Sequence, residues 1–294
     1  MTLPAGASNV RRVGGGDINE AFHVALADGR EAFVKTRADA APGEYAAEAA
    51  GLEWLGEPGA LRTPTVLDVD DRYLALEWIE PGRSGGLDAA GGEELGRGLA
   101  ATHVSGAPCF GWGAGWDAGE SGAARAAESP PSSGFGSLRL SNERSEDWPS
   151  FYAERRLRPL ARLARERGAL SAAGGDAVER VCERLDELCG PAEPPSRLHG
   201  DLWSGNVMAD SDGRPWLIDP AAYGGHREVD LAMLRLFGAP SERVFAAYEE
   251  VAPLAVGWRD RVELYQLLPL LVHTLLFGGS YAAAAERAAR RYVG

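Results

Sequence analysis

Apolar and polar side chains alternate near the start of the chain. Over residues 20–26 every second side chain is apolar, which is the spacing of a half-buried strand; the set is Phe22, Val24 and Leu26. Residues 31–36 read as a second strand, and Asp28-Gly29 between the two segments is a strong signal for a tight turn. The pattern predicts a β-hairpin.

The period of the pattern changes in the next segment. Over residues 42–55, Tyr45, Ala49, Leu52 and Leu55 recur at helical spacing, and a proline at position 42 suits a first helical turn. Two further apolar runs, 65–69 and 73–79, read as strands that complete a small sheet. We therefore expect residues 1–79 to form an N-terminal lobe of antiparallel strands with one helix.

The remainder of the chain has a mainly helical pattern. Apolar residues at three- and four-residue spacing predict helices over 92–103, 148–167, 176–188, 241–251 and 259–277. A run of small and polar residues over 111–136 is too poor in apolar residues to bury much surface, and it predicts a flexible surface loop. The expected fold class is α+β, with a larger helical C-terminal lobe over residues 80–294.

Composition narrows the class of protein. A net charge of −13 and a pI near 4.9 disfavour nucleic acid as a partner, because that affinity comes from clustered cations. The first residues lack the pattern of a signal peptide, and the longest apolar run, near 267–277, is too short and too interrupted to span a bilayer. Three cysteines show neither a disulfide framework nor metal-ligand spacing. We expect a cytoplasmic protein with no membrane partner.

One segment has the order of residues that phosphoryl transfer requires. Asp201 lies in His-Gly-Asp (199–201), Asn206 follows five residues later, and Asp219 comes directly after the apolar run 216–218. In kinases an aspartate of the catalytic loop accepts the hydroxyl proton, while an asparagine and a second aspartate hold Mg²⁺. We interpret Asp201 as the catalytic base, and Asn206 and Asp219 as further catalytic residues and Mg²⁺ ligands. A plain hairpin joining two strands around Asp212-Gly213 is compatible with this interpretation, whereas a metal hydrolase is disfavoured because the other histidines form no ligand set.

The N-terminal lobe contains candidate nucleotide-binding residues. A glycine-rich segment joins two predicted strands, where backbone could approach phosphates closely; its members are Gly14, Gly15, Gly16, Asp17, Ile18 and Asn19. Of the 30 basic residues only Lys35 is a lysine, and it lies on the second strand after this segment. We expect Lys35 to contact the ATP phosphates and to be held by a helix carboxylate. Glu44 and Glu48 are both candidates, and the buried stripe of the helix favours Glu48.

In these motifs the chain resembles the fructosamine kinase (ketosamine 3-kinase) family, a branch of the aminoglycoside phosphotransferase and choline kinase-like group. The resemblance extends over nearly the whole chain, and its most specific parts are the Leu-Trp-Ser-Gly insert after Asp201 and the run Gly-His-Arg-Glu-Val-Asp-Leu-Ala (225–232). It implies a protein-kinase-like fold and ATP-dependent phosphorylation of the sugar 3-hydroxyl of ketoamines, which leads to deglycation. It also implies that adenine lies against a hinge of Glu77, Trp78 and Ile79.

Residues near the motifs are candidates for binding the acceptor. Trp203 could stack on the sugar or fill the core, and His226, Arg227 and Glu228 could either line the acceptor pocket or form an ion-paired cluster. We expect Asp230 to orient the catalytic-loop backbone by accepting N–H bonds. His103 is expected to be a hydrogen-bonded core histidine, and His273 either a similar one or a residue that faces substrate.

Two rival functions remain open at this stage. The first is a kinase for another small acceptor, such as an aminoglycoside or an amino alcohol. The second is a nucleotide-binding pseudokinase, which the presence of Lys35, Asp201, Asn206 and Asp219 disfavours. The sequence leaves the preferred sugar and amine undetermined.

Overall fold

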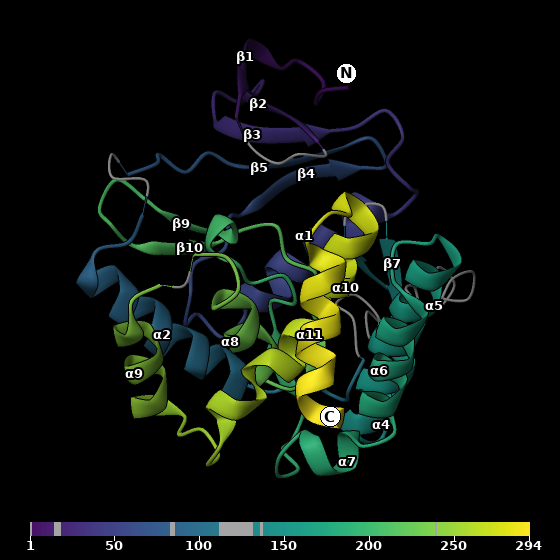
Figure 1. Cartoon of the computed structure of the whole chain (residues 1–294). Coiled ribbons are helices and arrows are strands. Elements are labelled where there is room, and N and C mark those ends of the chain that lie inside the picture. The colour runs from purple at the N-terminus through teal and green to yellow at the C-terminus, as the bar shows by residue number, and fades with distance from the viewer. Residues whose placement is uncertain (1, 15–18, 83–85, 112–131, 136–137, 239) are drawn as a thin grey trace.

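The N-terminal part of the chain is a five-stranded antiparallel sheet. We describe a computed structural model that covers residues 2–14, 19–82, 86–111, 132–135, 138–238 and 240–294. The strands follow the order β1-β2-β3-β5-β4 across the sheet. Their bounds are β1 Ser8–Val13, β2 Glu20–Ala25, β3 Glu31–Thr36, β4 Val66–Asp70 and β5 Tyr73–Glu77. The predicted hairpin is confirmed, and Figure 1 shows the sheet above a much larger helical part.

The two faces of this sheet bury different side chains. Phe22, Val24 and Val34 pack together on one face. Because side chains alternate along a strand, Phe33 and Lys35 lie on the opposite face. Helix α1 (Glu44–Gly56) covers that second face through Tyr45, Ala49 and Leu52. The predicted helical stripe is therefore confirmed, and it places Lys35 beneath the helix.

The helical part contains most of the expected helices and some others. Its elements are α2 Ala89–Val104, α4 Trp148–Tyr152, η1 Ala153–Leu157, α5 Arg158–Glu166, α6 Ala172–Cys182, α7 Leu185–Leu188, α8 Glu228–Leu234, α9 Glu242–Val251, η3 Trp258–Arg261, α10 Val262–Phe277 and α11 Tyr281–Val293. The helix predicted over 148–167 is continuous but contains the π-helical segment η1. The one predicted over 176–188 is instead broken after Cys182. Helix α11 packs on α10 and α6 and was not predicted, because the residues it buries fully are alanines, which give a weak apolar signal.

The proline inside α10 has a specific hydrogen-bond consequence. Pro269 has no N–H, so the carbonyl of Tyr265 one turn earlier lacks its usual helical partner. The hydroxyl of the buried Tyr152 lies 3.2 Å from that carbonyl and donates to it. The helix therefore continues through the proline, and its last turns reach the site described below.

The prediction of a flexible loop over residues 111–136 is wrong at the C-terminal end of that range. Backbone of residues 132–135 forms strand β6 (Ser132–Phe135), which pairs antiparallel with β7 (Leu138–Ser141). Cross-strand hydrogen bonds form independently of apolar content, so composition alone could not reveal this pairing. Residues 112–131 lie outside the described part of the chain, and the prediction for them stays a prediction. Within the described residues, no helix is both long and apolar enough to cross a bilayer.

Candidate active site

Two short strands bring Asn206 and Asp219 to one place. β9 (Val207–Ala209) pairs antiparallel with β10 (Pro215–Leu217), as the sequence predicted, and the short helix η2 (Ser204–Asn206) precedes β9. Just beyond the paired residues, the N–H of Ile218 donates to the backbone carbonyl of Asn206 at 3.1 Å. Asp219 follows with a φ of 52°, a left-handed conformation that aspartate adopts more readily than most residues. The pairing thus fixes the two predicted metal ligands at the same end of the hairpin.

The backbone before Asp201 is held by a buried carboxylate. Asp230 on α8 accepts hydrogen bonds from the N–H groups of His199 (2.7 Å) and Gly200 (2.9 Å). Gly200 has a φ of 84°, and a Cβ there would lie 2.2 Å from the carbonyl oxygen of Ala221, so only glycine fits. The expected contacts of Asp230 are confirmed.

His103 supports this arrangement from α2. Its ring nitrogens lie 2.8 Å from the hydroxyl of Tyr248 and 3.2 Å from the carboxylate of Asp230. The side chain is fully buried, so the prediction of a hydrogen-bonded core histidine is confirmed.

Asp201 and Asn206 are hydrogen-bonded to each other. The side-chain amide of Asn206 donates to the backbone carbonyl of Asp201 at 2.8 Å and to its carboxylate at 3.1 Å. Burial raises the pKa of the Asp201 carboxyl to about 7, against the lowering effect of the Asn206 hydrogen bond. A carboxylate with a pKa near neutrality is suited to accept a proton at physiological pH.

Lys35 joins the sheet to this hairpin. Its ammonium contacts the carboxylate of Glu48 and lies 2.9 Å from Oδ1 of Asp219. The Lys35 side chain is only 6% exposed, whereas that of Asp219 is 43% exposed and therefore reaches the open side of the site. Burial opposes the charge of Lys35, but the two carboxylates outweigh it and raise its pKa, while the Lys35 charge lowers the pKa of Asp219.

The structure distinguishes the two glutamates that were candidates for holding Lys35. Glu48 contacts Lys35, and burial raises the pKa of its carboxyl to about 7. Glu44 instead accepts two hydrogen bonds from Arg37, at 3.0 and 2.8 Å. The preference for Glu48 as the partner of Lys35 is confirmed as a contact, and its role toward ATP stays a prediction.

The donor set of Asn206 and Asp219 suits a hard divalent cation. Because the Asn206 nitrogen donates to Asp201, its side-chain oxygen is left as a possible ligand, and Asp219 uses only Oδ1 toward Lys35. Mg²⁺ prefers oxygen ligands and is commonly held by one or two carboxylates together with substrate phosphates. Among the described residues no group of three or more His, Cys, Asp or Glu could hold a metal.

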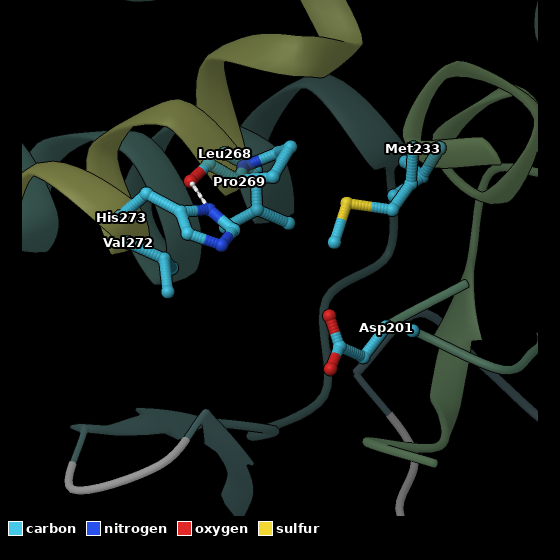
Figure 2. A pocket seen from close by; sticks show the side chains of 8 residues that line it. Asp201, Met233, Leu268, Pro269, Val272 and His273 are labelled. Atoms are coloured by element: carbon cyan, nitrogen blue, oxygen red, sulfur yellow. Dashed lines mark hydrogen bonds between the residues drawn. The ribbon is translucent and has the colours of Figure 1, made fainter. Parts of the chain in front are cut away.

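A hollow opens beside Asp201. Figure 2 shows it between the catalytic loop, α8 and the last turns of α10, with Asp201 and His273 on opposite sides. Its lining is otherwise mainly apolar, and the full set is Gly200, Asp201, Val229, Met233, Leu268, Pro269, Val272 and His273. Sequence reasoning left the position of His273 open because Asp201 and His273 are 72 residues apart and share no motif.

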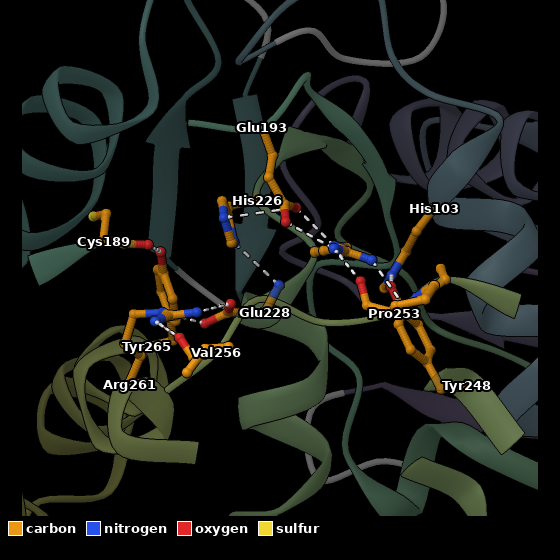
Figure 3. A network of polar contacts seen from close by, with 12 residues as sticks. His103, Cys189, Glu193, His226, Glu228, Tyr248, Pro253, Val256, Arg261 and Tyr265 are labelled. Atoms are coloured by element: carbon orange, nitrogen blue, oxygen red, sulfur yellow. Dashed lines mark hydrogen bonds and ion pairs between the residues drawn. The ribbon is translucent and has the colours of Figure 1, made fainter. Parts of the chain in front are cut away.

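His226 and Arg227 lie elsewhere, in an ion-paired cluster. Arg227 binds Glu193 through two bonds of 2.7 Å, and His226 is 3% exposed with its ring stacked on Tyr265. Arg261 binds Glu228 in the same bidentate manner. Figure 3 shows this network, and neither His226 nor Arg227 lines the hollow beside Asp201. Of the two alternatives for this segment, the contacts agree with the ion-paired cluster and not with an acceptor pocket.

The remaining predicted residues lie around the site or outside the described chain. Trp203 is 38% exposed, and its ring meets Phe237 edge to face, so it is available at the surface beside the catalytic loop. Glu77 ends β5, and Trp78 and Ile79 follow it. Tyr45 donates to the Asn19 side chain at 3.0 Å, which anchors the end of the glycine-rich segment to α1. Gly15, Gly16, Asp17 and Ile18 lie outside the described residues, and the nucleotide roles of the segment and the hinge stay predictions.

The sheet above a helical part, with this site between them, defines an enzyme of the kinase-like phosphotransferase class. More narrowly, the profile of the fructosamine kinase family matches residues 3–126 and 132–293, so this chain belongs to the fructosamine kinase family. The resemblance inferred from the sequence is confirmed.

Named relatives agree with this assignment. The chain is 33% identical over 278 residues to the "Probable ketoamine kinase" of Enterococcus faecium. The alignment covers 93% of this chain and 91% of the relative. It is 34% identical to the chloroplastic protein-ribulosamine 3-kinase of Arabidopsis thaliana, covering 95% and 80% of the two chains.

Solved structures agree as well. The crystal structure of the "putative fructosamine-3-kinase" of Thermobifida fusca superposes with a TM-score of 0.85 at 43% identity, covering 98% of this chain and 94% of that one. A macrolide 2'-phosphotransferase superposes with a TM-score of 0.60 at 16% identity, a likeness of fold alone. The predicted kinase-like fold is confirmed.

Proposed function

We propose that this protein transfers the γ-phosphate of ATP to the sugar 3-hydroxyl of ketoamines, the glycation products of fructosamine or ribulosamine type. Membership of the fructosamine kinase family and relatives named as ketoamine and ribulosamine kinases support the reaction class. The observation that carries the proposal is the placement of the Asp201 carboxylate in the lining of a hollow, hydrogen-bonded to Asn206 on its other side.

Each residue has a defined part in this reaction. Asp201 takes the proton of the acceptor hydroxyl while the oxygen of that hydroxyl bonds to the γ-phosphorus. The bond from this phosphorus to the β–γ bridging oxygen breaks, which releases ADP. Lys35, held by Glu48, would contact the α/β-phosphates together with the glycine-rich segment 14–19, and adenine would bind at residues 77–79. Asn206 and Asp219 would hold Mg²⁺, which when bound would neutralise phosphate charge.

The product explains why this phosphorylation removes a sugar from an amine. A phosphate on C3 lies β to the C2 carbonyl, so the product can lose phosphate by elimination and then release the free amine. We place this activity in the cytoplasm, where ATP is available and where the free thiols of Cys109, Cys182 and Cys189 stay reduced. We expect a small-molecule ketoamine or glycated amine as the partner and no nucleic acid.

An acceptor panel tests the proposal. ADP formation would be measured with ketoamines of fructose, ribulose and erythrulose, and with an aminoglycoside and an amino alcohol as the matched competing classes. We expect Mg²⁺-dependent turnover of the ketoamines and a kcat/KM at least 10²-fold lower, roughly, for the other acceptors, because a site with paired polar groups rejects acceptors that leave them unpaired. Preferential turnover of an aminoglycoside or amino alcohol would refute the substrate class. Absence of turnover with every acceptor would refute the enzymatic role.

A further inference from the structure

The His273 ring is held in one orientation by its neighbours. Its Nδ1 lies 2.8 Å from the carbonyl oxygen of Pro269 in the same helix. The ring meets Phe237 edge to face at 4.7 Å between centroids and stacks on Phe277 at 5.2 Å. Tyr281 lies 5.0 Å away on the following helix. With one hydrogen bond and three aromatic contacts, the ring has little freedom to turn.

This orientation determines the hydrogen-bonding character of the other ring nitrogen. A carbonyl oxygen can only accept, so Nδ1 must carry the proton that is shared with Pro269. Burial lowers the pKa of His273, which favours the neutral ring, and in a neutral ring with a protonated Nδ1 the Nε2 atom is an acceptor. Figure 2 shows Nε2 directed into the hollow, toward the side that carries Asp201.

The hollow therefore presents two hydrogen-bond acceptors between apolar walls. Among the described residues that line it, Asp201 and His273 are the only polar side chains, and the others are Gly200, Val229, Met233, Leu268, Pro269 and Val272. One hydroxyl carries one proton and can satisfy one acceptor. When Asp201 receives the proton of the reacting hydroxyl, a second group on the same substrate is free to donate to His273.

We propose that His273 is a specificity-determining residue that accepts a hydrogen bond from the hydroxyl adjacent to the one phosphorylated. This inference rests on the proposed function, under which the 3-hydroxyl meets Asp201. The amine side of a ketoamine carries a substituent of variable size that must extend into solvent, so the hydroxylated side of the sugar faces the hollow and one small polar group enters it. The donor is then the 4-hydroxyl, which fructosyl, ribulosyl and erythrulosyl amines all possess.

The test pairs two substrates with three forms of the enzyme. The substrates are a ketoamine of fructose with a small alkylamine and its 4-deoxy counterpart. The enzymes are the wild type, His273→Leu, which removes the acceptor, and His273→Gln, which keeps a carbonyl oxygen at about the same reach. In wild type we expect kcat/KM to be lower for the 4-deoxy compound by about 10- to 100-fold, the usual effect of an unpaired polar group.

The variants separate substrate recognition from a structural role. In His273→Leu we expect kcat/KM for the parent substrate to fall about tenfold or more and that for the 4-deoxy compound to change less than about threefold, because the lost bond exists only in the first pair. His273→Gln should retain part of the discrimination. Equal losses of kcat/KM on both substrates in His273→Leu would overturn the inference. A wild type with the same kcat/KM for both substrates would also overturn it, and this comparison does not require the Leu variant to fold.

Failure of the proposed function has a different signature. A wild type without turnover of any ketoamine would overturn both proposals together. A wild type that phosphorylates the ketoamine but ignores the 4-hydroxyl would overturn only the role of His273.

Discussion

At the scale of single residues, the site places three carboxylates in different environments. Asp201 is paired with an amide and has a pKa raised by burial, whereas Asp219 is paired with Lys35, whose charge lowers its pKa. Glu48 shares that ammonium from the helix side. Burial thus raises the pKa of Asp201 and Glu48 while Lys35 lowers that of Asp219, and a raised pKa for a base and a lowered one for a metal ligand are what the proposed roles of Asp201 and Asp219 require.

Replacement of Asp201 by asparagine tests the role of the base. The variant keeps the shape of the side chain but cannot accept a proton, so we expect kcat to fall by roughly 10²–10⁴-fold, the usual contribution of a general base. Affinity for Mg-ATP, measured by calorimetry, should stay nearly unchanged. Asp212→Asn on the exposed turn of the neighbouring β9–β10 hairpin is the matched control and should behave as wild type. Turnover by Asp201→Asn within a few-fold of wild type would rule out this role.

Lys35→Arg tests whether the site requires an ammonium. The guanidinium is planar and differently shaped, so it cannot replace a compact cation enclosed between Glu48 and Asp219, and we expect kcat/KM to drop by about 10²-fold or more. An acyl-phosphate derivative of ATP should label one peptide, containing Lys35, and excess Mg-ATP should suppress the labelling. Arg72→Lys adds an exposed amine in the same lobe and should remain unlabelled. Normal activity of Lys35→Arg, or labelling elsewhere, would mean that the nucleotide binds at another site.

At the scale of elements, the phase of helix α1 assigns its two glutamates to different partners. Glu48 faces the sheet and Lys35, while Glu44, one turn earlier, binds Arg37 near the start of the helix. Gly51 allows the same helix to approach the segment after Asp219, since a Cβ there would already contact Ala222 at 3.3 Å. Helix α1 thus contacts both the sheet and the segment after the β9–β10 hairpin, and it helps to position one relative to the other.

Alanine at each glutamate separates these two roles. We expect Glu48→Ala to reduce kcat/KM by about 10²-fold through misplacement of Lys35, with ketoamine phosphorylation as the assay. Glu44→Ala should leave activity within a few-fold and reduce stability by about 1 kcal/mol or less in urea unfolding, since it removes a partly exposed ion pair. Similar losses of activity in both variants would contradict the helix phase seen here.

At the scale of the whole molecule, stability depends on a buried polar network as well as on the apolar core. His226 is stacked on Tyr265, and its Nε2 lies 3.8 Å from Glu193. Burial lowers its pKa to about 4, with Glu193 acting in the opposite direction and the charges of Arg227 and Arg261 adding to the effect. The folded protein therefore resists a proton that the unfolded chain takes up readily.

This difference predicts a loss of stability in mild acid. Because the folded pKa is depressed from 6.5 to about 4, the contribution of His226 is complete above pH 6.5 and is lost as the pH falls toward 4. Linkage gives a loss of about 2 kcal/mol from this group between pH 7 and pH 5. Urea unfolding at pH 7, 6 and 5 would measure it, with His226→Gln as the comparison. The Gln variant should be less stable at pH 7 but lose less on acidification, and parallel curves would refute the assignment.

Short-range pattern was sufficient for most of what is local in this protein. The two-residue and helical spacings of apolar residues predicted the hairpin, the sheet with its helix, and most of the long helices. These elements bury one face, and burial of one face requires apolar residues at regular spacing along the sequence. The order Asp201, Asn206, Asp219 and the single lysine pointed to phosphoryl transfer, since that chemistry demands those groups. The fructosamine kinase family was visible in the same motifs.

Features that depend on contacts between distant segments became visible in the folded chain. His273 faces Asp201 because α10 passes the catalytic loop, and Arg227 turns away from the acceptor side because Glu193 and two carbonyls satisfy it. β6 pairs with β7 through backbone groups that carry no sequence signature, and α11 buries alanines that scarcely register as apolar. Local sequence specifies which elements form, whereas the contacts that aim a side chain at a site or away from it arise between residues far apart in the chain.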